Sequence, residues 1–343
     1  MKLFNYQLNN LPDYDWDNDL LMVLLGKARN IQGRLMGKMA SLDIELSQQA
    51  NLETLTLEVV KSAEIEGEIL DSRQVRSSIS KGLGINIHDP VRVDEFTNNL
   101  SGVILEATLD FESDLTTERL LMWSRSLLLK GNLNDDFFSS KSSNYNEEEI
   151  NKFIVWYNSE DSLDPLIKAG IAHLWFANLH SFYKYNGIIA RNISKMILSK
   201  SDERTFMFYS MSDQISLDIK NYKYILEMTQ RGLIDVTTWL QWFLNCFIKA
   251  INSSEQILGG VLLKQSFWSE IQLMRMNVRQ KKILDILRKD NKIIITSLSW
   301  AKQTHCSADT ALRDIQNLIK KNILKKDRAG GRSTCYMLFS EIS

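Results

Sequence analysis

Several residues able to do acid–base or anion chemistry lie close together at 180–191, in the stretch HSFYKYNGIIAR. His180 could act as a general base near neutral pH. Asn186 and Gly187 open a predicted helix, whose free N–H groups and dipole favour a bound phosphate. Arg191, about one turn further on, could hold the same anion through two hydrogen bonds. A lone histidine at a helix end is, however, more often structural than catalytic.

Two predicted helices position this loop. Asp164-Pro165 is a typical helix start, with a capping side chain followed by proline at the first helical position. The helix that follows, LIKAGIAHLWFANL, is apolar on nearly every face, which predicts a buried core helix with His173 as a core histidine. The second helix begins near Asn186.

The whole chain is expected to be mainly α. Further helical periodicity appears at 20–31, 52–60, 96–107, 117–129, 147–158 and 213–258, and the polar stretch 131–146 is expected to be a surface loop. We expect an N-terminal helical region at 1–90, a helical core at 91–260 and a small α+β domain at 277–343.

The C-terminal domain predicts a winged helix-turn-helix, with three helices followed by two strands joined at Gly330-Gly331. Residues 276–343 carry 14 Lys and Arg against 6 Asp and Glu, whereas residues 1–275 carry 27 against 36. This asymmetry indicates duplex DNA as a partner; the alternatives are a solvated basic face or a domain that contacts protein. The candidate DNA-binding residues lie on the last helix and the wing: Arg313, Lys320, Lys325, Lys326, Arg328 and Arg332.

Other classes are disfavoured by composition. The three cysteines are widely separated, so the sequence indicates neither a disulfide framework nor a metal site. No apolar run reaches the roughly 20 residues that span a bilayer, and the polar, acidic N-terminus is unlike a signal peptide. We therefore expect a cytoplasmic protein without a membrane partner, and the sequence leaves its oligomeric state open.

The segment at 180–191 resembles the Fic motif, HPFx(D/E)GNGRxxR. Fic proteins transfer AMP from ATP to a protein hydroxyl, using the histidine as base, the acidic residue as magnesium ligand and the GNG backbone and arginines as phosphate ligands. The resemblance implies that His180 is the base, that Phe182 anchors the loop, and that Asn186, Gly187 and Arg191 bind the nucleotide. ATP and magnesium are the ligands that it implies.

Four positions depart from that motif: Ser181 replaces proline, Lys184 the acidic metal ligand, Tyr185 the first glycine and Ile188 the first arginine. An ammonium cannot ligate magnesium, which requires oxygen ligands. Glycine alone adopts positive φ without a steric penalty, so tyrosine at 185 is also unfavourable. The joint loss predicts that AMP transfer is defective.

A second motif supports the same resemblance. Residues 62–67, SAEIEG, match (S/T)xxxE(G/N), the inhibitory motif that precedes the core in one class of Fic proteins. The resemblance implies that Ser62, Glu66 and Gly67 form the inhibitory helix end and that Glu66 pairs with Arg191. Taken alone, SAEIEG reads more readily as an ordinary helix end with solvated glutamates.

The resemblance covers nearly the whole chain, including a C-terminal winged helix. Relatives carry a β-hairpin flap that binds the target protein, whereas this chain has only a short polar interval at 131–149. Three functions follow: a catalytically defective Fic protein that acts by binding or regulation, a divergent enzyme that still transfers a nucleotidyl or phosphoryl group, or a DNA-binding regulator.

Overall fold

The computed structural model describes residues 14–87, 90–128, 147–159, 162–179, 181–202, 206–232, 234–289, 295–327 and 334–339. The chain divides into two compact units, Met1–Leu258 and Gly259–Ser343. The expected regions 1–90 and 91–260 thus fall almost entirely within one unit. The interval 131–149, where the sequence predicts a short polar loop instead of a flap, lies largely outside the described residues.

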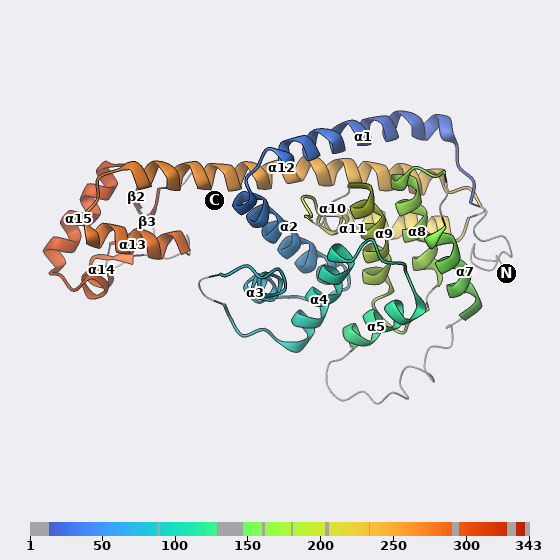
Figure 1. Cartoon of the computed structure of the whole chain (residues 1–343), viewed down its shortest axis with the longest axis horizontal. Coiled ribbons are helices and arrows are strands. Elements are labelled where there is room, and N and C mark those ends of the chain that lie inside the picture. The colour runs from blue at the N-terminus through green and yellow to red at the C-terminus, as the bar shows by residue number, and fades with distance from the viewer. Residues whose placement is uncertain are drawn as a thin grey trace. The chain divides into compact units, whose positions relative to one another are not determined.

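Unit 1 is a helical assembly (Figure 1). Its helices are α1 (Asn18–Ala40), α2 (Ile44–Ile65), α3 (Ser72–Gly82), α4 (Glu95–Leu109), α5 (Thr117–Leu128), α7 (Glu147–Asn158), α8 (Pro165–Leu179), α9 (Asn186–Asp202), α10 (Met211–Leu217), α11 (Ile219–Gln230) and the start of α12 (Thr237–Leu273). The Asp164 side chain accepts a hydrogen bond from the Leu166 N–H (2.8 Å), as the predicted helix start requires.

The core of unit 1 forms around α8, whose side chains are buried from Leu166 to Asn178 almost without interruption. Packing α9 and α12 against α8 removes a large apolar area from water, the main force that holds such a fold together. Gly170 permits the close approach of α12, because a Cβ atom there would lie 2.8 Å from the Leu240 side chain. The Trp239 indole also donates to the Gly170 carbonyl (2.8 Å).

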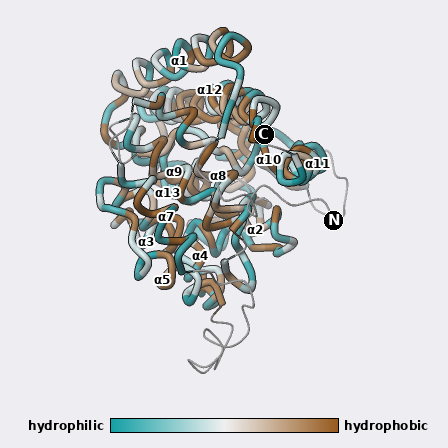
Figure 2. Tube along the Cα trace, turned by 90° about the vertical axis from the view of Figure 1, so that its right-hand side faces the viewer, coloured by the Kyte–Doolittle hydropathy of each residue, from teal (hydrophilic) through white to brown (hydrophobic). Residues whose placement is uncertain are grey.

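Helix α1 lies along α12 in both Figure 1 and Figure 2. The Asp17 N–H donates to the Thr237 hydroxyl (2.8 Å), and Lys38 pairs with Glu255 (2.6 Å), so the two helices run in parallel. None of the described helices is long and apolar enough to span a membrane.

Unit 2 contains the end of α12, α13 (Val278–Lys289), β1 (Ile295–Thr296), α14 (Ser297–Thr304), α15 (Ala308–Lys320), β2 (Leu324–Lys326) and β3 (Cys335–Leu338). The three strands form an antiparallel sheet in the order β1-β3-β2. Three helices followed by two paired strands occur in the order predicted from the sequence. Ser307 caps α15 as predicted, whereas the two-residue strand β1 is absent from the sequence prediction.

Candidate functional site

The loop between α8 and α9 is shaped by Asn186. Its side-chain oxygen accepts from the Phe182 N–H (3.0 Å), and its amide donates to the Phe182 carbonyl (2.6 Å), which closes a tight turn. Phe182 is buried beside Phe176, with ring centroids 6.2 Å apart. Phe182 thus anchors the loop as the resemblance implies. His180, the expected base, lies outside the described residues.

Tyr185 occupies the left-handed conformation, with φ of 65°, immediately before α9. Its ring is buried against Phe96, 5.7 Å between centroids, which offsets the backbone strain that glycine would avoid. The Tyr185 hydroxyl donates to Glu68 Oε1 (2.8 Å) and accepts from Lys184 Nζ (2.8 Å).

Lys184 also contacts Glu68 directly, at 2.9 Å between Nζ and Oε1. We call these three residues the Lys184–Tyr185–Glu68 cluster. Hydrogen bonds to Tyr185 and Glu68 raise the pKa of Lys184, so its ammonium is charged at neutral pH.

The cluster does not fit magnesium. Position 184 supplies an ammonium instead of an oxygen ligand, and Glu68 Oε1 is already taken by Lys184 and Tyr185. Within the described residues, no three His, Cys, Asp or Glu side chains gather closely enough to hold a metal ion.

Arg191 is buried and faces the end of α2. Its Nη2 donates to Glu66 Oε1 (3.1 Å), to the Ser62 carbonyl (3.0 Å) and to the Ser62 hydroxyl (3.1 Å), and Nε donates to that hydroxyl at 3.2 Å. The Arg191 side chain is 3% exposed and that of Glu66 22%. The ion pair expected from the sequence is therefore present.

Two glycines make this contact sterically feasible. Gly67 has φ of 82° and ends α2, with its N–H bonded to Glu64 and the Glu68 N–H bonded to Ala63, both at 3.0 Å. Gly187 lies in the first turn of α9, where a Cβ atom would collide with Glu66 Oε1. The Glu66 carboxylate thus lies at the N-terminus of α9, where the helix dipole favours negative charge.

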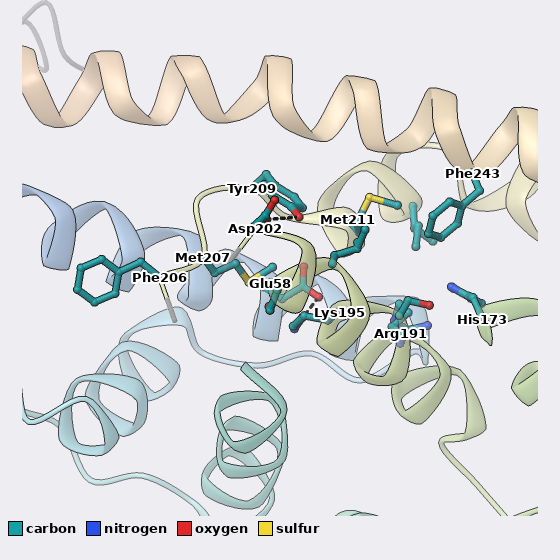
Figure 3. A pocket seen from close by; sticks show the side chains of 14 residues that line it. Glu58, His173, Arg191, Lys195, Asp202, Phe206, Met207, Tyr209, Met211 and Phe243 are labelled. Carbon is teal, nitrogen blue, oxygen red and sulfur yellow. Dashed lines mark hydrogen bonds and ion pairs between the residues drawn. The ribbon is translucent and has the colours of Figure 1, made fainter. Parts of the chain in front are cut away.

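A further buried pair joins the same two helices. Lys195 Nζ lies 3.1 Å from Glu58 Oε1, and Figure 3 shows the two side chains facing each other. Glu58 also accepts from the hydroxyls of Ser210 (2.6 Å) and Ser212 (2.8 Å). Burial alone would raise the pKa of Glu58, but Lys195 and these hydroxyls hold it below its usual value.

Glu58, Lys195 and Arg191 line a cavity with about 20 Å³ of free space, room for one water molecule (Figure 3). His173 lies at the same cavity, where its Nε2 is 3.1 Å from the Tyr222 hydroxyl. Burial, together with the charge of Arg191, lowers the pKa of His173 to about 3. His173 is therefore a neutral core histidine, as predicted.

The structure brings together most of the residues that the sequence singled out. Ser62, Glu66, Gly187 and Arg191 meet at the α2–α9 contact, and Lys184 lies beside them through Glu68. Three of the departures from the motif, Ser181, Tyr185 and Ile188, are buried side chains.

Three interacting residues were missed from the sequence: Glu58, Glu68 and Lys195. Their spacing and charge in the sequence could have indicated these contacts. Glu58 precedes Ser62 by four residues and Lys195 follows Arg191 by four, so each pair shares a helix face. Glu68 supplies a carboxylate for Lys184, the residue that stands where the motif has an acidic side chain.

The predicted DNA-binding residues lie in unit 2. Arg313 and Lys320 are exposed on α15, Lys326 is exposed on β2, and Lys325 is half-buried. Arg328 and Arg332 lie outside the described residues. Nothing in this geometry identifies DNA as the ligand.

The chain was compared with protein families, curated sequences and solved structures. A family described as "Domain of unknown function (DUF4172)" matches residues 4–85. No curated protein sequence matches the chain.

Among solved structures, a Fic family protein from Desulfovibrio desulfuricans G20 is similar over 96% of this chain and 98% of its own, with 14% identity and a TM-score of 0.55. A fragment of Fic-1 from C. elegans, residues 134–508, is similar over 71% of this chain and 74% of its own, with 21% identity and a TM-score of 0.51. The chain therefore has the fold of Fic proteins.

Proposed function

We propose that this protein is a catalytically defective relative of the Fic AMP transferases, which acts by binding instead of nucleotidyl transfer. The observation that carries the proposal is the occupation of the anion loop by the chain's own side chains. Glu66 lies against the first turn of α9 and against Arg191, and Lys184 is engaged by Glu68 where the motif has a metal ligand.

The other departures act in the same direction. Ile188 is fully buried in the core, so a phosphate contact of the motif is replaced by apolar packing. Loss of one charge-stabilising group typically lowers a rate by about 10²–10³. Loss of the metal ligand and of an arginine together leaves little transfer.

The test is incubation of the full-length protein with radiolabelled ATP, magnesium and lysate proteins. We expect no label above background for the wild type or for Glu66→Gly, with His180→Ala in each background as the control. Label in the Glu66→Gly protein that disappears with His180→Ala would establish the rival function, a divergent active transferase.

A DNA-binding role for unit 2 is the second candidate. It is supported by the net charge of +8 over residues 276–343 and by the exposure of Arg313, Lys320 and Lys326. Basic side chains on one helix and the adjoining strand are typical of a surface that contacts the phosphate backbone.

A further inference from the structure

We propose that a cavity at the C-terminal end of α9 binds a free α-amino acid with an apolar side chain. The cavity has a volume of about 370 Å³, within the roughly 300–1,000 Å³ of pockets that hold small ligands. Its described walls are the loop 111–114, the end of α7, the start of α8 and the end of α9. Helix α9 begins at Asn186, so Lys200 lies about 20 Å further along the helix, and the cavity is separate from the loop between α8 and α9.

Charges of opposite sign line this cavity without pairing. The carboxylates of Glu112 and Asp114 come from the loop before α5, and the Lys200 ammonium comes from the last turn of α9. These three side chains are exposed, and none of them forms an ion pair with another described residue. The ammonium therefore lies beyond the roughly 4 Å of an ion pair from both carboxylates. A ligand that carries an ammonium and a carboxylate can bridge this separation, whereas a simple anion or cation cannot.

The carboxylate end of such a ligand fits the donors on α9. Ser201 Oγ accepts a hydrogen bond from Arg29 Nη1 at 3.0 Å, and its own hydrogen has no acceptor among the described residues. Lys200 and Ser201 thus supply an ammonium and a hydroxyl donor to the lining of one cavity. Hydrogen bonds between charged groups are shorter and stronger than those between neutral groups, so a carboxylate is the favoured acceptor here.

The ammonium end of the ligand fits Asp114 and Tyr157. The Tyr157 hydroxyl, on a half-buried side chain at the end of α7, has no hydrogen-bond partner among the described residues. Burial raises the pKa of Tyr157 and the charge of Asp114 adds to this effect, whereas Arg119 opposes it, so the carboxylate lies near the phenol. The Asp114 carboxylate can pair with a ligand ammonium, and the phenol oxygen can accept a hydrogen bond from the same group.

Apolar side chains form the other part of the lining. Phe111 and Ile197 are buried, and Leu163 packs partly buried against the same core. These side chains form no hydrogen bonds, so an apolar group of the ligand is favoured there by its removal from water. An α-amino acid such as phenylalanine or leucine combines this apolar group with the two charges that the polar lining requires.

Titration calorimetry of the full-length protein tests the site with three probes. These are L-phenylalanine, phenethylamine, which lacks the carboxylate, and 3-phenylpropionate, which lacks the ammonium. We expect L-phenylalanine to bind at least about tenfold more tightly than either analogue, because each analogue loses a hydrogen bond between charged groups.

Two variants assign the ends of the ligand. Lys200→Gln should weaken the binding of L-phenylalanine at least about tenfold and leave the binding of phenethylamine unchanged. Asp114→Asn should weaken L-phenylalanine to a similar extent and leave 3-phenylpropionate unchanged. The matched control is Lys223→Gln, an exposed lysine of α11 that does not line the cavity, which should leave all three affinities unchanged.

The comparison of the three probes uses the wild type, so it does not depend on the folding of a variant. Absence of L-phenylalanine binding would overturn the proposal, and equal affinities for L-phenylalanine and 3-phenylpropionate would assign a plain anion site instead. Wild-type affinity in folded Lys200→Gln and Asp114→Asn proteins would also refute it. None of these results bears on AMP transfer, which is measured separately at the other end of α9.

Discussion

Replacing Glu66 with alanine should destabilise the fold. Arg191 is buried, and Glu66 is its acidic partner at 3.1 Å. Loss of one partner of a fully buried ion pair costs about 3–5 kcal/mol. Glu66 is partly exposed, and Ser62 keeps its contacts to Arg191, so we expect roughly 1–3 kcal/mol, nearer the value of a hydrogen bond to a charged group.

Urea unfolding of the full-length protein measures this loss of stability. We expect the midpoint urea concentration to fall, while the slope of the unfolding free energy against urea concentration stays the same. The matched control is Glu64→Ala, two residues earlier, whose side chain is half exposed and pairs with Lys61 at 2.7 Å. Such an exposed pair should contribute less than about 1 kcal/mol. Equal stabilities of the Glu66→Ala and Glu64→Ala proteins would show that Arg191 does not depend on Glu66.

Two more predictions concern His173 and unit 2. The pKa of His173 is lowered to about 3, below the value of about 6.5 in the unfolded chain, so its contribution to stability is complete above pH 6.5 and is lost as the pH falls toward 3. Between pH 7 and 5 the wild type should lose about 2 kcal/mol of unfolding free energy through this group. His173→Gln should lack that component, and an identical pH dependence of the two proteins would contradict the assignment. For unit 2, we expect weak duplex DNA binding by the full-length protein that falls steeply with salt and is reduced by Arg313→Gln/Lys320→Gln. Electrophoretic mobility shifts on mixed-sequence duplexes test this, and no shift at low salt would end the DNA hypothesis.

The helices were predictable because their signals are local. Asp164-Pro165 caps α8, Ser307 caps α15, and Gly67 ends α2, and each depends on side chains within a few residues. Strand β1 was missed because a two-residue strand is too short to show an alternating pattern. It is defined by the pairing of Ile295 with Tyr336 and of Thr296 with Cys335, which are distant in the sequence.

The site was predictable only where a motif named both partners. Glu66 and Arg191 are 125 residues apart, and the resemblance alone connected them. Glu68 was missed because it matters only through the altered loop: a lysine at 184 and a tyrosine at 185 created a need for an acid nearby. The contacts of Glu68 with Lys184 and Tyr185 depend on the tertiary fold, so they cannot be recognised from the sequence around position 68.

The Glu58–Lys195 pair is one of several polar contacts that join α2 to α9. Glu58 contacts Lys195, whereas Ser62 and Glu66 both contact Arg191. Polar contacts therefore recur about every turn along α2 and α9, which run antiparallel. Removing Glu58 or Lys195 alone leaves a fully buried charge without its partner, at a cost of several kcal/mol. Lys184, by contrast, is half exposed. Its ion pair with Glu68 therefore contributes little to the stability of the fold. Burial alone does not separate the kept positions from the changed ones, because Ser181, Tyr185 and Ile188 are buried as well. Arg191 differs from these three in being a buried charge with an acidic partner.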